Sequence, residues 1–152
     1  MAEKIVVDGS NVAHIETSGD GSPKISNIQA VRSALQDRGY DPVIIVDASL
    51  RHEIDDPQQL EHLLEDEKIH QAPSDTDADY FIVETADREG ARIVSNDRYE
   101  EYQDDFSWIP DRRVPLMIID GEVELYELGE AGTDEDGRGA GAPSPSADEG
   151  GG

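Results

Sequence analysis

Ile5-Val6-Val7-Asp8-Gly9-Ser10-Asn11 is an apolar run that ends on an aspartate and then turns. The segment Ile93-Val94-Ser95-Asn96-Asp97 has the same form much later in the chain. Short, continuous apolar runs are typical of buried parallel strands, and ligands bind outside the carboxyl ends of such strands. The two runs therefore predict a parallel sheet with Asp8 and Asp97 at its carboxyl edge.

Strand-like and helix-like segments alternate up to residue 128. Apolar runs predict strands over residues 4–8, 42–47, 69–72 and 91–95. The predicted helices are one capped by Ser26 and stopped by Gly39, one that begins at Pro57, and two over residues 77–90 and 98–103.

Asp120-Gly121 is the dipeptide that favours a two-residue hairpin turn, here between strands over residues 116–119 and 122–128. Repeated strand–helix units imply a mostly parallel sheet with helices on both faces. We therefore expect an α/β fold: a three-layer α/β/α domain with a C-terminal hairpin at the edge of the sheet.

The composition changes sharply after Leu128. Residues 129–152 consist of Gly, Ala, Pro, Ser, Thr and acids with one arginine and no large apolar side chain, so they cannot offset the entropy of ordering. We expect one folded domain over residues 1–128 and a disordered acidic tail over residues 129–152. Without the tail's six acids and one arginine, the net charge changes from −24 to −19.

The folded part is thus strongly acidic, with 36 acidic and 12 basic residues in the whole chain. Such self-repulsion weakens a fold in dilute buffer, whereas molar salt cuts the Debye length to ~3 Å. We interpret the composition as halophilic adaptation. An intrinsically disordered acidic protein is the alternative, but the regular apolar runs argue against it.

The absence of cysteine excludes disulfides and thiolate metal sites. No stretch approaches the ~20 apolar residues of a membrane span, and the N-terminus enters a strand directly, without a signal peptide. We expect a soluble, cytoplasmic protein that does not bind membranes.

A third acidic point, Asp75-Thr76-Asp77-Ala78-Asp79, opens an apolar helix between the two runs. Carboxylates that converge from distant segments repel one another unless a cation neutralises them. Oxygen ligands of this kind suit Mg²⁺, with Mn²⁺ as its substitute. The pattern indicates a metal-dependent enzyme that acts on phosphate esters, in which Asn11 or Ser10 holds a carboxylate or the attacking water.

Each acid also has a plainer interpretation as a solvated surface group or a helix cap, and this interpretation is strongest for Asp75. Asp47 ends another strand and stays open as a further participant, while Asp120 is interpreted as a turn residue. The four histidines lack the spacing of zinc hydrolases, and neither a serine nucleophile elbow nor a Gly-rich phosphate loop is present.

The segments Val7-Asp8-Gly9-Ser10-Asn11-Val12-Ala13 and Val94-Ser95-Asn96-Asp97-Arg98-Tyr99 resemble the NYN branch of the PIN-like nucleases, specifically the Regnase-type ribonuclease domain. The resemblance covers roughly residues 4–127. It implies a PIN-like sheet and Mg²⁺-dependent hydrolysis of RNA phosphodiester bonds.

The resemblance also implies roles for individual residues. Asp8, Asp79 and Asp97 match catalytic, metal-binding carboxylates, with Asn11 beside them. The family's other central acid falls on Ala78, where Asp77 substitutes from one residue earlier. Glu101 matches a further metal-site acid. The expected substrate contacts are Ser10, Arg51 and Arg98.

Single-stranded RNA is the expected partner, because its backbone reaches a recessed metal site without a duplex clash. Further phosphate contacts are expected from His52, Arg112 and Arg113, and base stacking from Trp108 or Tyr99. Three alternatives stay open: an inactive RNA- or protein-binding module, a phosphohydrolase of small nucleotides, and, for the assembly, a homodimer.

Overall fold

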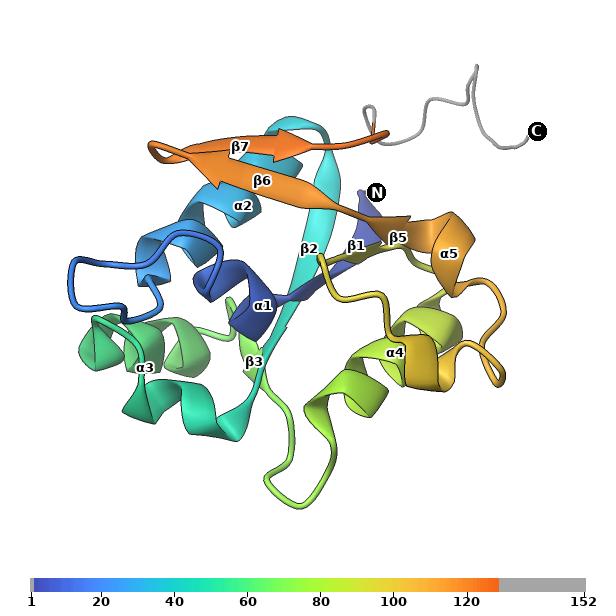
Figure 1. Ribbon diagram of the computed structural model, residues 1–152, viewed down its shortest axis with the longest axis horizontal. Coiled ribbons are helices and arrows are strands. Elements are labelled where there is room, and N and C mark those ends of the chain that lie inside the picture. The colour runs from blue at the N-terminus through green and yellow to red at the C-terminus, as the bar shows by residue number, and fades with distance from the viewer. Residues whose placement is uncertain (1, 129–152) are drawn as a thin grey trace.

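A five-stranded parallel sheet forms the centre of the protein, with β1 as its middle strand (Figure 1). The computed structural model describes residues 2–128, so the predicted tail lies outside the described residues. The strands, in the spatial order β3-β2-β1-β4-β5, are β1 (Glu3–Asp8), β2 (Tyr40–Val46), β3 (His70–Gln71), β4 (Ile93–Val94) and β5 (Arg113–Val114).

Helices cover both faces of this sheet (Figure 1). The α-helices are α1 (Gly9–Ala13), α2 (Ile25–Asp37), α3 (Pro57–Glu65), α4 (Ala78–Glu89) and α5 (Ile109–Arg112). Two 3-10 helices, η1 (Ala48–His52) and η2 (Glu100–Tyr102), lie in the loops after β2 and β4. The predicted α/β class is confirmed. Among residues 2–128, no helix is long and apolar enough to cross a membrane.

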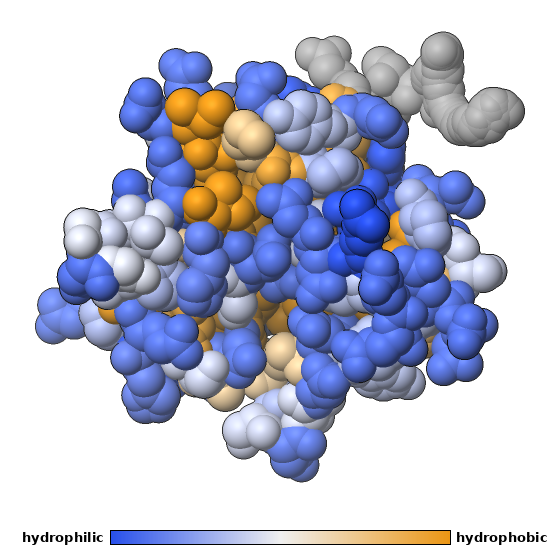
Figure 2. Space-filling view, in the orientation of Figure 1, coloured by the Kyte–Doolittle hydropathy of each residue, from blue (hydrophilic) through white to orange (hydrophobic). Residues whose placement is uncertain are grey.

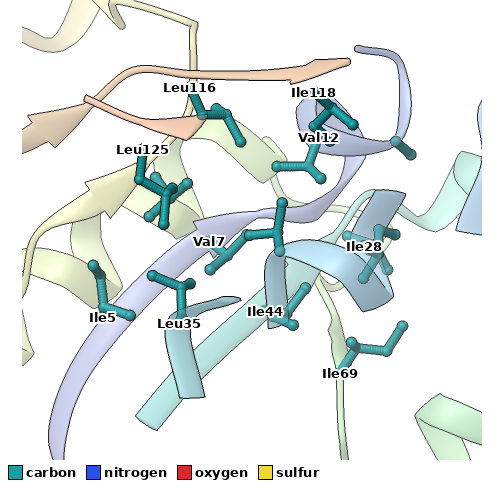
Figure 3. Close-up of a cluster of buried hydrophobic side chains, with 14 of the residues drawn as sticks. Ile5, Val7, Val12, Ile28, Leu35, Ile44, Ile69, Leu116, Ile118 and Leu125 are labelled. Atoms are coloured by element: carbon teal, nitrogen blue, oxygen red, sulfur yellow. The ribbon is translucent and has the colours of Figure 1, made fainter. Parts of the chain in front are cut away.

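Successive side chains of the central strands point to opposite faces and build two cores. Ile5 and Val7 of β1 join the larger cluster with α1, α2 and the hairpin (Figure 3), whereas Val6 between them joins the cluster under α4. All three are fully buried. This is the arrangement expected for a parallel strand covered on both sides, and it explains why the run at residues 5–7 is apolar without interruption.

The C-terminal hairpin consists of β6 (Leu116–Ile119) and β7 (Glu122–Leu125), joined at the predicted turn. Asp120 and Gly121 have φ of 51° and 80°, as a type I′ turn requires. The hairpin forms a separate two-stranded sheet and does not extend the edge of the central one. Its buried residues Leu116 and Ile118 pack instead on the larger core, beside α2.

The predicted cap of α2 is wrong. The N-cap residue is Lys24, and the first free N–H group, that of Ile25, donates to Asp55 Oδ1 at 2.9 Å. A carboxylate from a distant loop therefore does what Ser26 was expected to do. Gly39 does follow the helix with φ of 89°, as predicted.

The strand order defines where a ligand would bind. From β1 the chain moves outward through β2 and β3, and then crosses to the other side of β1 to form β4 and β5. The carboxyl ends of β1 and β4 therefore flank a topological switch point, which is the usual ligand crevice of an open α/β sheet. Asp8 ends β1 and Ser95 follows β4, so both motifs lie at this crevice.

Gly9 tests how tightly this crevice is built. A Cβ added to Gly9 would lie 2.7 Å from Val46 Cγ1 and 3.0 Å from the backbone oxygen of Ile45. Overpacking of this kind costs ~1–3 kcal/mol, more than the gain in helix propensity from alanine. We expect Gly9→Ala to lower the free energy of unfolding by about 1–2 kcal/mol in denaturant titrations in concentrated KCl. Gly19→Ala is the control, because nothing lies within 4 Å of its Cβ; equal losses in both variants would contradict the argument.

Candidate active site at the carboxyl ends of β1 and β4

Asp8 is a buried carboxylate, 4% exposed, at the end of the central strand. Its Oδ1 accepts the backbone N–H of Asn11 at 3.2 Å, which caps α1. Its Oδ2 accepts the Tyr99 hydroxyl at 2.6 Å and the Ser95 hydroxyl at 3.3 Å. Burial raises the pKa of Asp8, and the hydrogen bonds from Tyr99, Asn11 and Ser95 oppose that rise.

Asp97 is held next to Asp8 by the loop that follows β4. Its backbone N–H donates to Ser95 Oγ at 3.0 Å, so the serine hydroxyl bridges the two aspartates. Its Oδ1 accepts the backbone N–H of Tyr99 at 2.8 Å. Asn11 Oδ1 accepts the N–H of Asn96 at 3.0 Å, which ties the β1 motif to the β4 motif a second time. The two predicted motifs are therefore one hydrogen-bonded unit.

Asp79 reaches the same place from the first turn of α4. Its half-buried carboxyl has its pKa raised to about 6, first by burial and then by the charges of Asp8, Asp97, Asp77 and Glu101. Repulsion of this kind requires the carboxylates to be near one another. Carboxylates from three segments of the chain, at the end of β1, at the start of α4 and after β4, thus lie near one another.

Asp77 has a different environment from the other acids. Its Oδ1 accepts the N–H of Asp79 at 3.0 Å and so caps α4, and its Oδ2 accepts the Tyr102 hydroxyl at 2.5 Å. Both oxygens are therefore engaged, whereas the neighbouring Ala78 packs on the smaller core. Asp77 adds negative charge to the cluster, and its geometry is that of a helix cap.

Glu101 and Arg98 lie on the open side of the cluster. They line a pocket of about 550 Å³ together with Asn96, Asp97 and Glu100. Both side chains are exposed. This pocket gives Asp97 access to solvent. The guanidinium group of Arg98 and the carboxylates of Glu100 and Glu101 line it as well.

The other predicted substrate contacts are engaged within the fold. Arg51 donates to Gln71 Oε1 at 2.7 Å and pairs with Glu61 at 3.1 Å. Ser10 Oγ accepts the N–H of Asp47 at 2.8 Å, and this bond connects the ends of β1 and β2. Asp47 itself caps η1 through Ser49. Ser10 and Arg98 keep donors for a substrate, but Arg51 lies in an ion pair beside β3.

The sequence reasoning missed the role of Tyr99 and Ser95. Trp108 or Tyr99 was predicted to stack on bases, and this is wrong for Tyr99, because its side chain is 2% exposed and its hydroxyl donates to Asp8. A sequence signal for this role does exist: Tyr99 lies two residues after Asp97, and a tyrosine buried beside the acids would need a partner for its hydroxyl. Ser95 is also fully buried, and its hydroxyl likewise donates to Asp8.

The donor set suits a hard divalent cation. Among residues 2–128, no three His, Asp or Glu side chains are grouped closely enough to hold a metal ion by themselves. Mg²⁺ does not need such a cage, because it is usually bound by one or two carboxylates together with waters and substrate phosphates. The half-buried carboxylates of Asp79 and Asp97 and the uncompensated repulsion around Asp79 fit this mode.

Comparisons with known proteins give the family and the fold. A family model described as the Zc3h12a-like ribonuclease NYN domain matches residues 1–123. Two solved structures of the nuclear protein-only RNase P 2 of Arabidopsis thaliana share the fold. The first has a TM-score of 0.66 at 19% identity and covers 85% of this chain and 30% of that one. The second has a TM-score of 0.65 at 19% identity, with coverage of 86% and 30%. No curated protein sequence matches significantly.

The raised pKa of Asp79 predicts how stability depends on pH. Between its ordinary pKa of 3.8 and the folded value of about 6, the native state holds the proton more tightly, so stability falls as pH rises through this window. The full shift corresponds to ~3 kcal/mol, which partial exposure reduces to ~1 kcal/mol. Without divalent metal, we expect Asp79→Asn to raise the free energy of unfolding by about 1 kcal/mol above pH ~6 and to flatten the curve below it. Asp41→Asn, an exposed residue of β2, is the control; an equal gain there would indicate a general charge effect.

The bond between Tyr99 and Asp8 predicts a second effect on stability. Tyr99→Phe removes a hydrogen bond to a buried carboxylate, and such bonds contribute ~1.5–3 kcal/mol. We expect a loss of this size in the free energy of unfolding, measured by denaturant titration. Tyr40→Phe is the matched control, because Tyr40 is also buried and none of the hydrogen bonds among residues 2–128 involves its hydroxyl. Similar losses in both variants would mean that the hydroxyl of Tyr99 has no special role.

Proposed function

Because the chain belongs to the Zc3h12a-like ribonuclease NYN domain family, whose members are RNA-cleaving nucleases, we propose that it is a Mg²⁺- or Mn²⁺-dependent endoribonuclease that cleaves single-stranded RNA. The observation that carries the proposal is the convergence of Asp8, Asp79 and Asp97 at the switch point of the sheet, where burial and then the charges of Asp8 and Asp97 raise the pKa of Asp79. Hydrolysis would leave a 5′-phosphate and a 3′-hydroxyl.

Asp79 and Asp97 are the residues that would hold the cation, with Asp8 behind them. When bound, the cation supplies positive charge to the scissile phosphate and lowers the pKa of an attacking water. Asp8 is fixed by three donors, so it keeps the loop after β4 in register with β1. Asp77 and Glu101 add charge that attracts the cation, and Glu101 does so from the pocket mouth.

Without a cation, the pKa of Asp79 is raised to about 6, first by burial and then by the neighbouring acids, so a bound cation would be what keeps this carboxylate ionised as a ligand. Asn11 keeps its Nδ2 group for the substrate or the attacking water, since its Oδ1 is used by Asn96. Arg98 lines the pocket and is a candidate for a contact with the RNA backbone.

Single-stranded RNA suits a surface with so much negative charge. The affinity of nucleic-acid-binding proteins normally comes from cations that displace counterions, and the net charge of −24 makes this contribution unfavourable. At high ionic strength the repulsion is screened. Metal bridges and contacts to unpaired bases, which a duplex does not offer, would then carry binding.

An inactive RNA-binding module is the second candidate, and Ala78 is the observation that favours it. The resemblance puts an acid at this position, and the structure shows Asp77 engaged with Tyr102 and the helix N-terminus. Under this alternative the protein binds metal and RNA without cleaving it.

The test is cleavage of a labelled unstructured RNA in multimolar KCl with Mg²⁺, Mn²⁺ or EDTA. We expect metal-dependent endonucleolytic cleavage, and a loss of about 100- to 1000-fold in kcat for Asp97→Asn, because that variant removes one charge next to the reacting phosphate. Asp120→Asn is the matched control: it makes the same change at the hairpin turn, where asparagine tolerates the positive φ.

Thermal unfolding with and without Mg²⁺ separates the two candidates. A ligand that binds only the folded state raises the melting temperature. Stabilisation by Mg²⁺ that disappears in Asp97→Asn, without cleavage by the parent protein, would favour the inactive module. Cleavage that persists in EDTA, or at the parent rate in Asp97→Asn, would contradict the proposal.

A further inference from the structure

Four aromatic side chains form a row on the α4 side of the crevice. Tyr102 of η2 packs against Tyr80 of α4 with 5.8 Å between ring centroids. Tyr80 packs against Phe106 at 6.2 Å, and Phe106 packs against Trp108 at 6.2 Å. The rings meet at interplanar angles of 59° to 68°. The row therefore runs as tilted and edge-to-face contacts.

Tyr80 is the exposed member of this row. It is 39% exposed, whereas the other three pack partly buried against the smaller core. Phe106 and Trp108 thus pack the loop after η2 onto α4. The exposed part of the Tyr80 side chain is open to solvent in the part of the chain that the structure describes. A large aromatic surface of this kind, supported from behind by other rings, is a rigid platform for a planar ligand.

The platform is joined to the candidate active site. Tyr80 directly follows Asp79 in α4, and Tyr102, its neighbour in the row, donates its hydroxyl to Asp77 at 2.5 Å. Asp77 in turn caps the N–H of Asp79. A polymer whose phosphate lies at Asp79 and Asp97 would therefore have a neighbouring unit within reach of Tyr80.

The surroundings favour a neutral flat group over a phosphate. Glu84 lies 3.4 Å from the Tyr80 hydroxyl, and the exposed acids Glu100, Glu101, Asp104 and Asp105 flank the row in sequence. Figure 2 shows that the surface of this side is mostly hydrophilic, while the apolar surface gathers over the β6–β7 hairpin. Phosphates are repelled by these acids, whereas a nucleobase is uncharged and can stack on an aromatic ring.

We propose that Tyr80, supported by Tyr102 and Phe106, is a base-stacking subsite for an unpaired nucleotide that flanks the scissile phosphate. This inference rests on the proposed function for the identity of the ligand. It gives an acidic protein an affinity for RNA that does not depend on cations. Stacking is tolerant of sequence, so the subsite selects single-stranded RNA without selecting a particular base.

The first test measures binding without cleavage. The dissociation constant of a fluorescently labelled unstructured RNA is measured by anisotropy in EDTA and concentrated KCl. Removal of a stacking ring weakens binding by about 5- to 150-fold, and we expect an effect in this range for Tyr80→Ala. Tyr80→Phe retains the ring and should bind as the parent protein does. Tyr126→Ala is the matched control, because Tyr126 is 44% exposed and lies on the hairpin.

A second test identifies the contact as one with a base. Single abasic nucleotides are placed at successive positions of the RNA. At one position the abasic RNA should bind the parent protein more weakly by about the factor measured for Tyr80→Ala, and it should bind Tyr80→Ala with no further loss. Additive losses at every position would overturn the assignment, as would unchanged RNA binding by Tyr80→Ala.

Failure of this inference and failure of the proposed function give different results. If the parent protein cleaves RNA and Tyr80→Ala has the parent KM, the subsite is wrong while the nuclease stands. If the parent protein does not cleave RNA but its binding depends on Tyr80, the nuclease is wrong while the subsite stands. If the subsite is correct in an active enzyme, Tyr80→Ala should raise KM with little change in kcat, since it removes binding common to ground and transition states.

Discussion

The structure depends on the burial of the Asp8 carboxylate at the end of the central strand. A buried carboxylate is costly unless it is hydrogen-bonded. Here the donors come from Asn11 in the next turn and from Ser95 and Tyr99 in the loop after the neighbouring strand β4. The bonds from Ser95 and Tyr99 form only if β4 lies beside β1. The need to hydrogen-bond the buried Asp8 carboxylate therefore favours this strand order at the switch point. Asp97, two residues after Ser95, is brought to the crevice by the same bonds.

Charge limits how many carboxylates can gather there. Asp8 is stabilised by its hydrogen-bond donors. Asp79 is half-buried and is repelled by the charges of Asp8, Asp97, Asp77 and Glu101. Repulsion among these carboxylates therefore lowers the free energy of unfolding when no cation is bound, and their negative charges attract a cation. The rest of the chain is acidic too, so the same repulsion acts over the whole surface. Salt screens the charges of the exposed acids, but it screens the charge of the buried Asp8 much less.

Much of this site could be predicted from the sequence because the decisive signals are local. The apolar runs before Asp8 and Asp97 predicted two strands of a parallel sheet, which the structure places side by side, and Asp120-Gly121 predicted its turn. The short helices α1 and η1, the helix α5 and the edge strand β5 were missed, since pieces of two to five residues carry little periodicity.

The differences between expectation and structure have a common physical cause, which is contact with residues far away in the chain. Asp55 caps α2 where Ser26 was expected to do so. Arg51, the expected substrate contact, pairs with Glu61 and donates to Gln71. Tyr99 was assigned to bases because its sequence position does not reveal that its hydroxyl meets Asp8. Each of these bonds joins residues at least 10 positions apart, and single-sequence patterns do not report such contacts.

The environment of Asp77 bears on what the loss of an acid at Ala78 means. Both carboxylate oxygens of Asp77 already accept a hydrogen bond, one from the N–H of Asp79 and the other from the Tyr102 hydroxyl. That second bond anchors Tyr102, and through its ring contact it anchors the Tyr80 platform as well. Under the proposed function Asp79 and Asp97 would suffice, because Mg²⁺ is usually bound by one or two carboxylates together with waters and phosphates. Under the two proposals, the carboxyl group of Asp77 positions aromatic rings, and the site would bind RNA by stacking as well as through metal.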